Sequence, residues 1–127
     1  MKYILDTHVV LWFAEYSRKL SDRAYGAILD AKASAYVSMA SAWEVAIKLN
    51  TGKLDLDGGV SEFFRMIDVN GFTMLAIERE HLVQMEILPD HHKDPFDRMI
   101  IATAMVEEMT LITVDDNIHR YDLSLLW

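Results

Sequence analysis

The sequence predicts an α/β fold in which helices cover both faces of a mainly parallel β-sheet. Short apolar runs typical of strands alternate with longer segments of helical periodicity along the 127 residues. The strand-like runs are apolar along most of their length, which is typical of parallel strands buried on both faces. No repeat, low-complexity tract or linker interrupts the pattern, so residues 1–127 are expected to form a single domain.

The first half of the chain alternates between strand and helix signals. Its strands are expected from short apolar runs, and its helices from apolar residues spaced three to four apart. Ser21 can cap the second helix through its side-chain oxygen, and Gly52 can end the third. In chain order, the expected elements are a strand at 2–5, helices at 7–15 and 21–32, a strand at 35–38 and a helix at 41–50.

The second half continues the alternation and contains both prolines of the chain. Asp94 is expected to cap the last helix, with Pro95 in its first turn. That helix is apolar on most faces, which predicts that it is buried. The expected elements are a helix at 60–67, a strand at 72–77, helices at 78–85 and 94–109, a strand at 111–114 and an edge strand within 121–127.

The net charge of −8, with a pI near 4.9, bears on the class of protein. A simple nucleic-acid coat would need a broad basic face, so this class is disfavoured. A nuclease remains compatible with the charge, because bound cations and a local strip of Lys and Arg can neutralise phosphates. The acidic surface also favours a basic protein partner.

The chain contains no cysteine, which excludes a disulfide framework, a thiolate zinc site and a thiol nucleophile. The adjacent His91 and His92 lack the spaced partners that a zinc site needs. The first residues resemble no signal peptide, and no apolar stretch approaches the ~20 residues of a membrane span. We therefore expect a cytoplasmic protein without membrane contact.

Four acidic residues lie at boundaries between expected elements: Asp6, Glu44, Asp97 and Asp115. Asp6 and Asp115 each end an apolar strand run, and the carboxyl ends of parallel strands line the crevice where ligands bind. Carboxylates gathered in a crevice repel one another, so we expect a bound cation. Mg²⁺ or Mn²⁺ prefers oxygen ligands, and a pair of such ions can support in-line cleavage of a phosphodiester.

Each of these acids also has a purely structural explanation. Asp6 could cap a helix, and Asp97 could favour the dipole of a helix N-terminus. Glu44 and Lys48 are spaced i and i+4, as in a common surface ion pair. Asp115 begins an ordinary polar turn. Their joint placement, rather than any single residue, indicates a metal pocket.

Four sequence blocks combine these acids with characteristic neighbours. The blocks are 5–8 (LDTH), 38–48 followed by 52–54 (SMASAWEVAIK and GKL), 92–102 (HKDPFDRMIIA) and 111–115 (LITVD). In this order they resemble PIN-domain proteins, specifically the VapC-like toxins of VapBC toxin–antitoxin systems. The resemblance implies a PIN-like three-layer fold, with helices flanking a mainly parallel sheet, and a metal-dependent ribonuclease.

The resemblance also implies roles for individual residues. It assigns catalysis and the binding of Mg²⁺ or Mn²⁺ to Asp6, Glu44, Asp97 and Asp115, with Asp6 and Asp97 as the principal pair. Small hydroxyl and basic side chains are expected near the pocket, where they would hydrogen-bond carboxylates or hold the RNA backbone. These candidates are Thr7, Ser38, Lys48, Lys53, Arg98 and Thr113.

The partners implied by the resemblance are an RNA substrate, a VapB-like antitoxin and a second copy of the chain in a homodimer. Two other functions remain open. An aspartyl phosphotransfer enzyme commonly carries Asp-x-Asp after its first strand, but His8 occupies the third position here. A PIN-like interaction module that has lost catalysis is disfavoured because all four acids are present.

Overall fold

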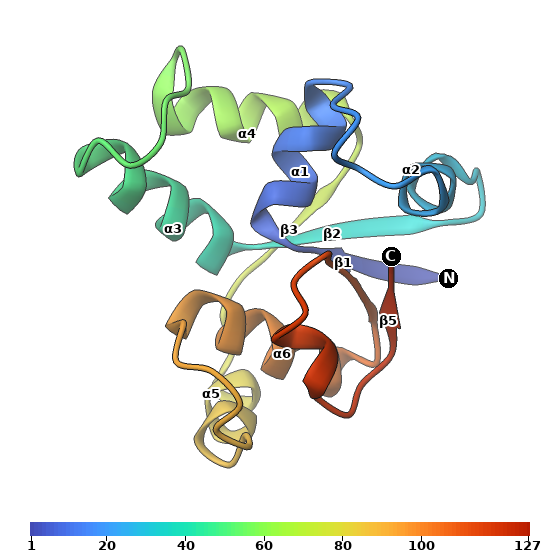
Figure 1. Cartoon of the computed structure of the whole chain (residues 1–127), viewed down its shortest axis with the longest axis vertical. Helices are drawn as coiled ribbons and strands as arrows, with labels where there is room; N and C mark the ends of the chain where they lie inside the picture. Colours follow the sequence, from blue (N-terminus) through green and yellow to red (C-terminus); the bar gives the residue numbers. More distant parts are fainter.

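A computed structural model describes all 127 residues of the chain. Its centre is a five-stranded sheet in which every neighbouring pair of strands is parallel, in the order β3-β2-β1-β4-β5. The predicted α/β fold with a parallel sheet flanked by helices is therefore confirmed (Figure 1). The strands are β1 (Lys2–Leu5), β2 (Ser34–Ser38), β3 (Thr73–Leu75), β4 (Thr110–Ile112) and β5 (Leu125–Leu126).

Helices cover both faces of this sheet. Figure 1 shows α1 and α4 on one side of the sheet and α5 and α6 on the other. The helices are α1 (Thr7–Ala14), α2 (Asp22–Leu29), α3 (Met39–Asn50), α4 (Gly59–Val69), α5 (Arg79–Glu86) and α6 (Pro95–Glu107), followed by a 3-10 turn, η1 (Ile118–Arg120). None of these helices is both long and apolar enough to cross a bilayer.

The central strand β1 contributes to two hydrophobic cores, because successive side chains of a strand point to opposite faces. Tyr3 and Leu5 join a core of 17 buried residues shared with α1, α2 and α4. Ile4, between them, joins a core of 12 buried residues dominated by α6. The sheet is thus buried on both faces, as the apolar strand runs predicted.

The connection order creates a switch point beside β1. The chain adds β2 and β3 on one side of β1, and then β4 and β5 on the other. In open α/β sheets, ligands bind outside the carboxyl ends of the strands at such a point. Here that edge carries Asp6 directly after β1 and residues 113–115 directly after β4.

Several element boundaries differ from those expected. The helix expected from 41 begins at Met39, because Ser38 both ends β2 and caps α3, its Oγ accepting the Ala40 N–H at 3.0 Å. The helix expected over 21–32 ends at Leu29. The strands expected at 72–77 and 111–114 are shorter, and η1 was not expected.

Candidate metal and active site

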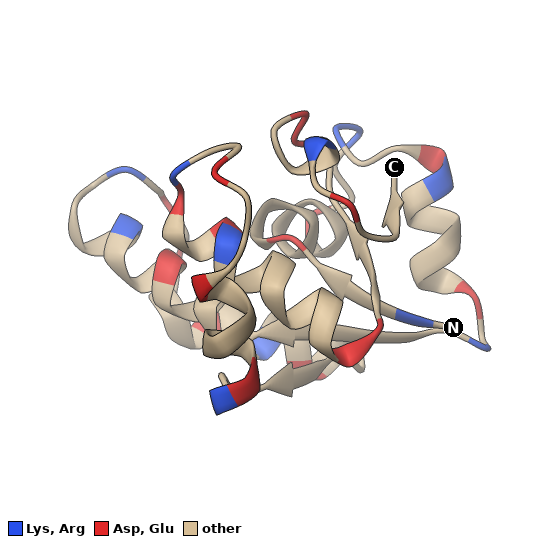
Figure 2. Ribbon diagram, turned by 90° about the horizontal axis from the view of Figure 1, so that it is seen from below, with Lys and Arg blue, Asp and Glu red and all other residues tan.

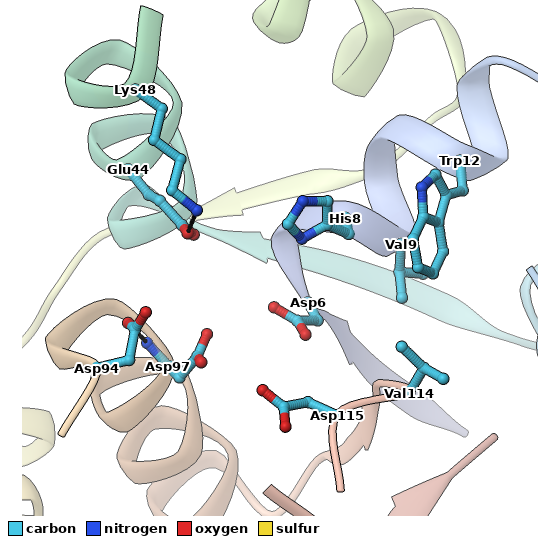
Figure 3. Close-up of a pocket in the computed structure, with 10 residues that line it drawn as sticks. All are labelled: Asp6, His8, Val9, Trp12, Glu44, Lys48, Asp94, Asp97, Val114 and Asp115. Atoms are coloured by element: carbon cyan, nitrogen blue, oxygen red, sulfur yellow. Dashed lines mark hydrogen bonds and ion pairs between the residues drawn. The ribbon is translucent and has the colours of Figure 1, made fainter. Parts of the chain in front are cut away.

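A pocket of about 400 Å³ opens at the carboxyl edge of the sheet (Figure 3). Five of its ten lining residues carry a carboxylate, and a single lysine is the only Lys or Arg among them. All four acids singled out in the sequence are brought together here. The lining residues are Asp6, His8, Val9, Trp12, Glu44, Lys48, Asp94, Asp97, Val114 and Asp115.

Asp6 is fixed by the strand that precedes it and by the helix that follows it. It caps α1, its Oδ1 accepting the Thr7 N–H at 2.7 Å, while its Oδ2 accepts the Thr113 hydroxyl at 2.7 Å. Burial raises the pKa of Asp6 and the charge of Glu44 adds to the rise, although these two hydrogen bonds and His8 oppose it. The Asp6 side chain therefore both caps α1 and lines the pocket.

Glu44 lies almost fully buried on α3, with both oxygens engaged. Its Oε1 accepts the Thr7 hydroxyl at 2.6 Å, and its Oε2 accepts from Lys48 Nζ at 2.6 Å. Burial by itself would lower the pKa of Lys48, but the hydrogen bond to Glu44 and the charges of Glu44, Asp94 and Asp97 outweigh it and raise that pKa. The expected Glu44–Lys48 pair is thus part of the pocket rather than a solvated surface pair.

Asp94 and Asp97 enter the pocket from the first turn of α6. Asp94 is the expected cap, its Oδ1 accepting the N–H groups of Phe96 at 2.9 Å and Asp97 at 3.0 Å. Burial raises the pKa of Asp97 to about 8, and the negative charges of the four other acids of the pocket add to the effect. Without a bound cation, Asp97 therefore retains its proton at neutral pH.

Asp115 follows β4 on a turn that is tied to Asp6 through one hydroxyl. Thr113 Oγ1 donates to Asp6 and accepts the Asp115 backbone N–H at 3.2 Å. Asp115 Oδ1 accepts the Asn117 N–H at 2.9 Å, so the polar turn expected at this position is also present. The Thr113 hydroxyl therefore couples the carboxyl ends of β1 and β4.

Replacing Thr113 with Val should destabilise the protein by about 1–3 kcal/mol, because the isosteric side chain leaves a buried Asp6 oxygen and the Asp115 N–H without a partner. Urea unfolding measures the change. Thr110→Val, in the strand β4 that precedes Thr113, is the matched control, because its hydroxyl pairs only with Ser124 Oγ at an exposed position. Equal effects of the two substitutions would contradict the importance of the Thr113 link.

Five of the six candidate hydroxyl and basic residues are not among those that line the pocket. Ser38 is buried and its hydroxyl caps α3. Arg98 points away from the pocket and donates to the carbonyls of residues 88, 89 and 92 and to the Tyr121 hydroxyl. Its charge therefore does not reach the pocket, contrary to the expectation from the sequence. Lys53 is likewise absent from the lining. Thr7 and Thr113 act instead by holding Glu44 and Asp6.

Other lining residues were not anticipated from the sequence. Asp94 was expected only to cap a helix, although its carboxylate also borders the pocket. His8 and Trp12 of α1 form one wall, with their ring centroids 5.7 Å apart. Helical spacing could have placed His8 and Trp12 on one face of α1, but nothing in the sequence indicated that this face borders the acids.

The carboxylates of Asp6, Asp97 and Asp115 are turned toward a shared space (Figure 3). As they stand, no three His, Asp or Glu side chains are arranged so that they could hold a metal ion together. An all-oxygen donor set nevertheless fits Mg²⁺, which commonly binds through one or two carboxylates and keeps several waters.

Away from the pocket, Lys and Arg are scattered among Asp and Glu along the ribbon (Figure 2).

Comparison with known proteins agrees with this architecture. A family model described as "PIN domain" matches residues 3–123. Among curated protein sequences, none matches this chain. Solved structures with the same fold include VapBC2 from Rickettsia felis bound to a DNA fragment from their promoter. There the TM-score is 0.72 at 17 % identity, over 99 % of this chain and 98 % of that one.

Two further structures share the fold over nearly the whole chain. DNA-bound VapBC from Salmonella typhimurium has a TM-score of 0.70 at 12 % identity, covering 99 % of this chain and 97 % of that one. FitAcB from Neisseria gonorrhoeae has a TM-score of 0.67 at 17 % identity, covering 98 % of this chain and 96 % of that one. At these identities the likeness concerns the fold.

Proposed function

This chain belongs to the PIN domain family, and from that premise we propose that it is a Mg²⁺- or Mn²⁺-dependent endoribonuclease, the toxin of a toxin–antitoxin pair. One observation carries the proposal. Five carboxylates line a single pocket that contains only one lysine and no arginine. Burial and the repulsion between these acids together raise the pKa of Asp97, and a divalent cation would offset both effects.

Asp6 and Asp97 would be the principal ligands of the cation, and Glu44 and Asp115 would complete its surroundings. When bound, Mg²⁺ or Mn²⁺ supplies an activated water and stabilises charge on the phosphoryl oxygens. Thr7 and Thr113 keep Glu44 and Asp6 in place through hydrogen bonds of 2.6 and 2.7 Å. Such fixed ligands avoid reorganisation during the reaction, because strands and helices position them.

In this proposal Lys48 both pairs with Glu44 and helps to bind the RNA substrate. It neutralises Glu44 through an ion pair of 2.6 Å and presents a positive charge at the pocket, with about a third of its side chain exposed. A basic side chain there can pair with a phosphate of the RNA backbone. The overall charge of −8 would otherwise repel the substrate.

We further propose a VapB-like antitoxin and a homodimer. The solved structures that share this fold include VapBC assemblies, and an acidic pocket suits a basic segment of such a partner. Exposed apolar side chains on α3 and α5 support self-association, since Trp43 is 59 % and Val83 65 % exposed. Light scattering of the purified chain tests the dimer.

The proposed activity is tested by incubating the purified chain with RNA in EDTA and then in excess Mg²⁺ or Mn²⁺. We expect cleavage only with the metals, new RNA ends on sequencing, and suppression when a VapB-like antitoxin is co-expressed. Calorimetry with Mn²⁺ on the same preparation measures binding directly. Intact RNA together with absent Mn²⁺ binding would instead indicate an interaction module without catalysis.

No observation favours an aspartyl phosphotransfer enzyme. His8 occupies the position where such an enzyme would carry its second aspartate, and its ring lies against Trp12 on the pocket wall. The Asp6 carboxylate already accepts two hydrogen bonds from Thr7 and Thr113, which reduces its nucleophilicity. The geometry therefore suits Asp6 as a ligand rather than as an attacking group.

A further inference from the structure

A second polar cluster lies behind Asp97, outside the residues that line the pocket. It joins His92, in the loop before α6, to Tyr121, which follows η1, and to Arg98 on α6. His92 Nδ1 lies 2.9 Å from the Tyr121 hydroxyl, and Arg98 donates to the same hydroxyl at 3.0 Å. The side chain of His92 is only 11 % exposed and Tyr121 only 4 % exposed, so water competes little for these bonds.

Donor and acceptor rules determine which nitrogen of His92 carries the proton. A guanidinium has only donors, so the Tyr121 oxygen accepts from Arg98. The phenolic hydrogen still needs an acceptor, and of the two hydrogen-bond partners of the Tyr121 hydroxyl only His92 Nδ1 can accept it. Because Nδ1 accepts, the neutral ring of His92 carries its proton on Nε2.

That Nε2–H group is buried and has no hydrogen-bond partner within normal distance. The acid beside it is Asp97, whose Oδ2 lies 3.4 Å from Nε2. A buried N–H without a partner is costly, and a small movement toward Oδ2 would satisfy it. The backbone N–H of Asp97 already donates a hydrogen bond to Asp94 Oδ1.

We propose that His92 is a positioning residue for Asp97, holding Oδ2 through Nε2–H so that Oδ1 faces the pocket. Tyr121 fixes the tautomer of His92, and Arg98 fixes the hydroxyl of Tyr121. This inference rests on the proposed function, in which Asp97 binds the cation. Partners of metal ligands orient those ligands, and losing such a partner typically weakens metal binding by about 10–100-fold.

Two substitutions separate the roles of the two ring nitrogens. In His92→Gln the side-chain amide nitrogen can occupy about the position of Nε2, whereas in His92→Asn it occupies about that of Nδ1. We expect His92→Asn to weaken Mn²⁺ binding by about 10–100-fold in calorimetry, and His92→Gln to retain most of the wild-type affinity. A purely structural role for His92 would not distinguish the two variants in this way.

The adjacent His91 provides the control. Its ring also packs against Tyr121, with centroids 4.7 Å apart, but no ring nitrogen of His91 is hydrogen-bonded to Tyr121 or Asp97. His91→Asn should therefore leave Mn²⁺ affinity unchanged. Thermal unfolding of each metal-free variant shows whether it folds. If His92→Asn is unstable, the Mn²⁺ affinity of His92→Gln is compared directly with that of the wild type.

Nitrogen-15 NMR of the metal-free protein tests the tautomer without any metal. We expect the proton of neutral His92 on Nε2, and a mixture of tautomers in Tyr121→Phe. A proton on Nδ1 in the wild type, or equal Mn²⁺ affinity in all three histidine variants, would overturn this inference but not the proposed function. Absent Mn²⁺ binding by the wild type would overturn the proposed function and this inference with it.

Discussion

Asp97→Asn should abolish metal-dependent RNA cleavage while making the metal-free protein more stable at pH 8. Asn keeps the size of the side chain but removes the charge that would hold a cation. We expect cleavage to fall by at least about 10³-fold, equivalent to about 4 kcal/mol of transition-state stabilisation. Asp6→Asn should cause a similar loss of activity, because its carboxylate lies in the same pocket.

The gain in stability separates this outcome from simple misfolding. Burial and four neighbouring acids make ionised Asp97 unfavourable in the folded protein, and Asn removes that penalty. Cleavage is measured from RNA end formation in Mn²⁺, and stability from urea unfolding in EDTA. Asp116→Asn is the matched control, since this exposed neighbour of Asp115 does not line the pocket. An active Asp97→Asn variant would remove Asp97 from the proposed site.

The contrast between Asp97 and Arg98 shows what local sequence reasoning can and cannot predict. Asp97 was placed correctly because a helix cap and Pro95 fix the start of α6, and the residues of its first turn follow from that start. Arg98 was expected near the substrate, but its partners lie in the loop at 88–92 and at Tyr121, 23 positions along the chain. Such tertiary contacts leave no periodic signal.

Residues with two roles were also difficult to interpret from the sequence. Asp94 has a sufficient explanation as a helix cap, and this role was preferred to one at the pocket, which its carboxylate also lines. Ser38 matched a position near the pocket, but its hydroxyl is used to start α3. Strand positions, the parallel sheet and the meeting of the four acids were predictable, because they follow from apolar runs and from strand ends at one edge.

The stability of the metal-free protein should decrease as the pH rises from 5 to 8. The pKa of Asp97 is raised from its ordinary value of 3.8 to about 8, so in this range the folded protein keeps a proton that the unfolded chain has released. Rising pH therefore favours the unfolded chain. The slope is up to about 1.4 kcal/mol per pH unit, on the order of 4 kcal/mol over the whole range.

The contribution of Asp97 is isolated by comparison with Asp97→Asn. Urea unfolding of both proteins in EDTA at pH 5, 6, 7 and 8 gives two curves of unfolding free energy, and their difference should grow with pH until about pH 8. Parallel curves would show that Asp97 ionises normally in the folded state. A stabilising effect of rising pH specific to the wild type would contradict the sign of the shift.

A divalent cation should cancel this pH dependence. Mn²⁺ must displace the Asp97 proton, so its affinity should increase by up to about tenfold per pH unit until Asp97 is ionised near pH 8. A ligand that binds only the folded state adds RT ln(1 + [L]/Kd) to the free energy of unfolding. The stability that a fixed excess of Mn²⁺ adds to the wild type should therefore be largest at pH 8. The same acids that destabilise the metal-free protein would then stabilise the metal-bound one. Asp97→Asn should lose both effects together, because both depend on the same proton.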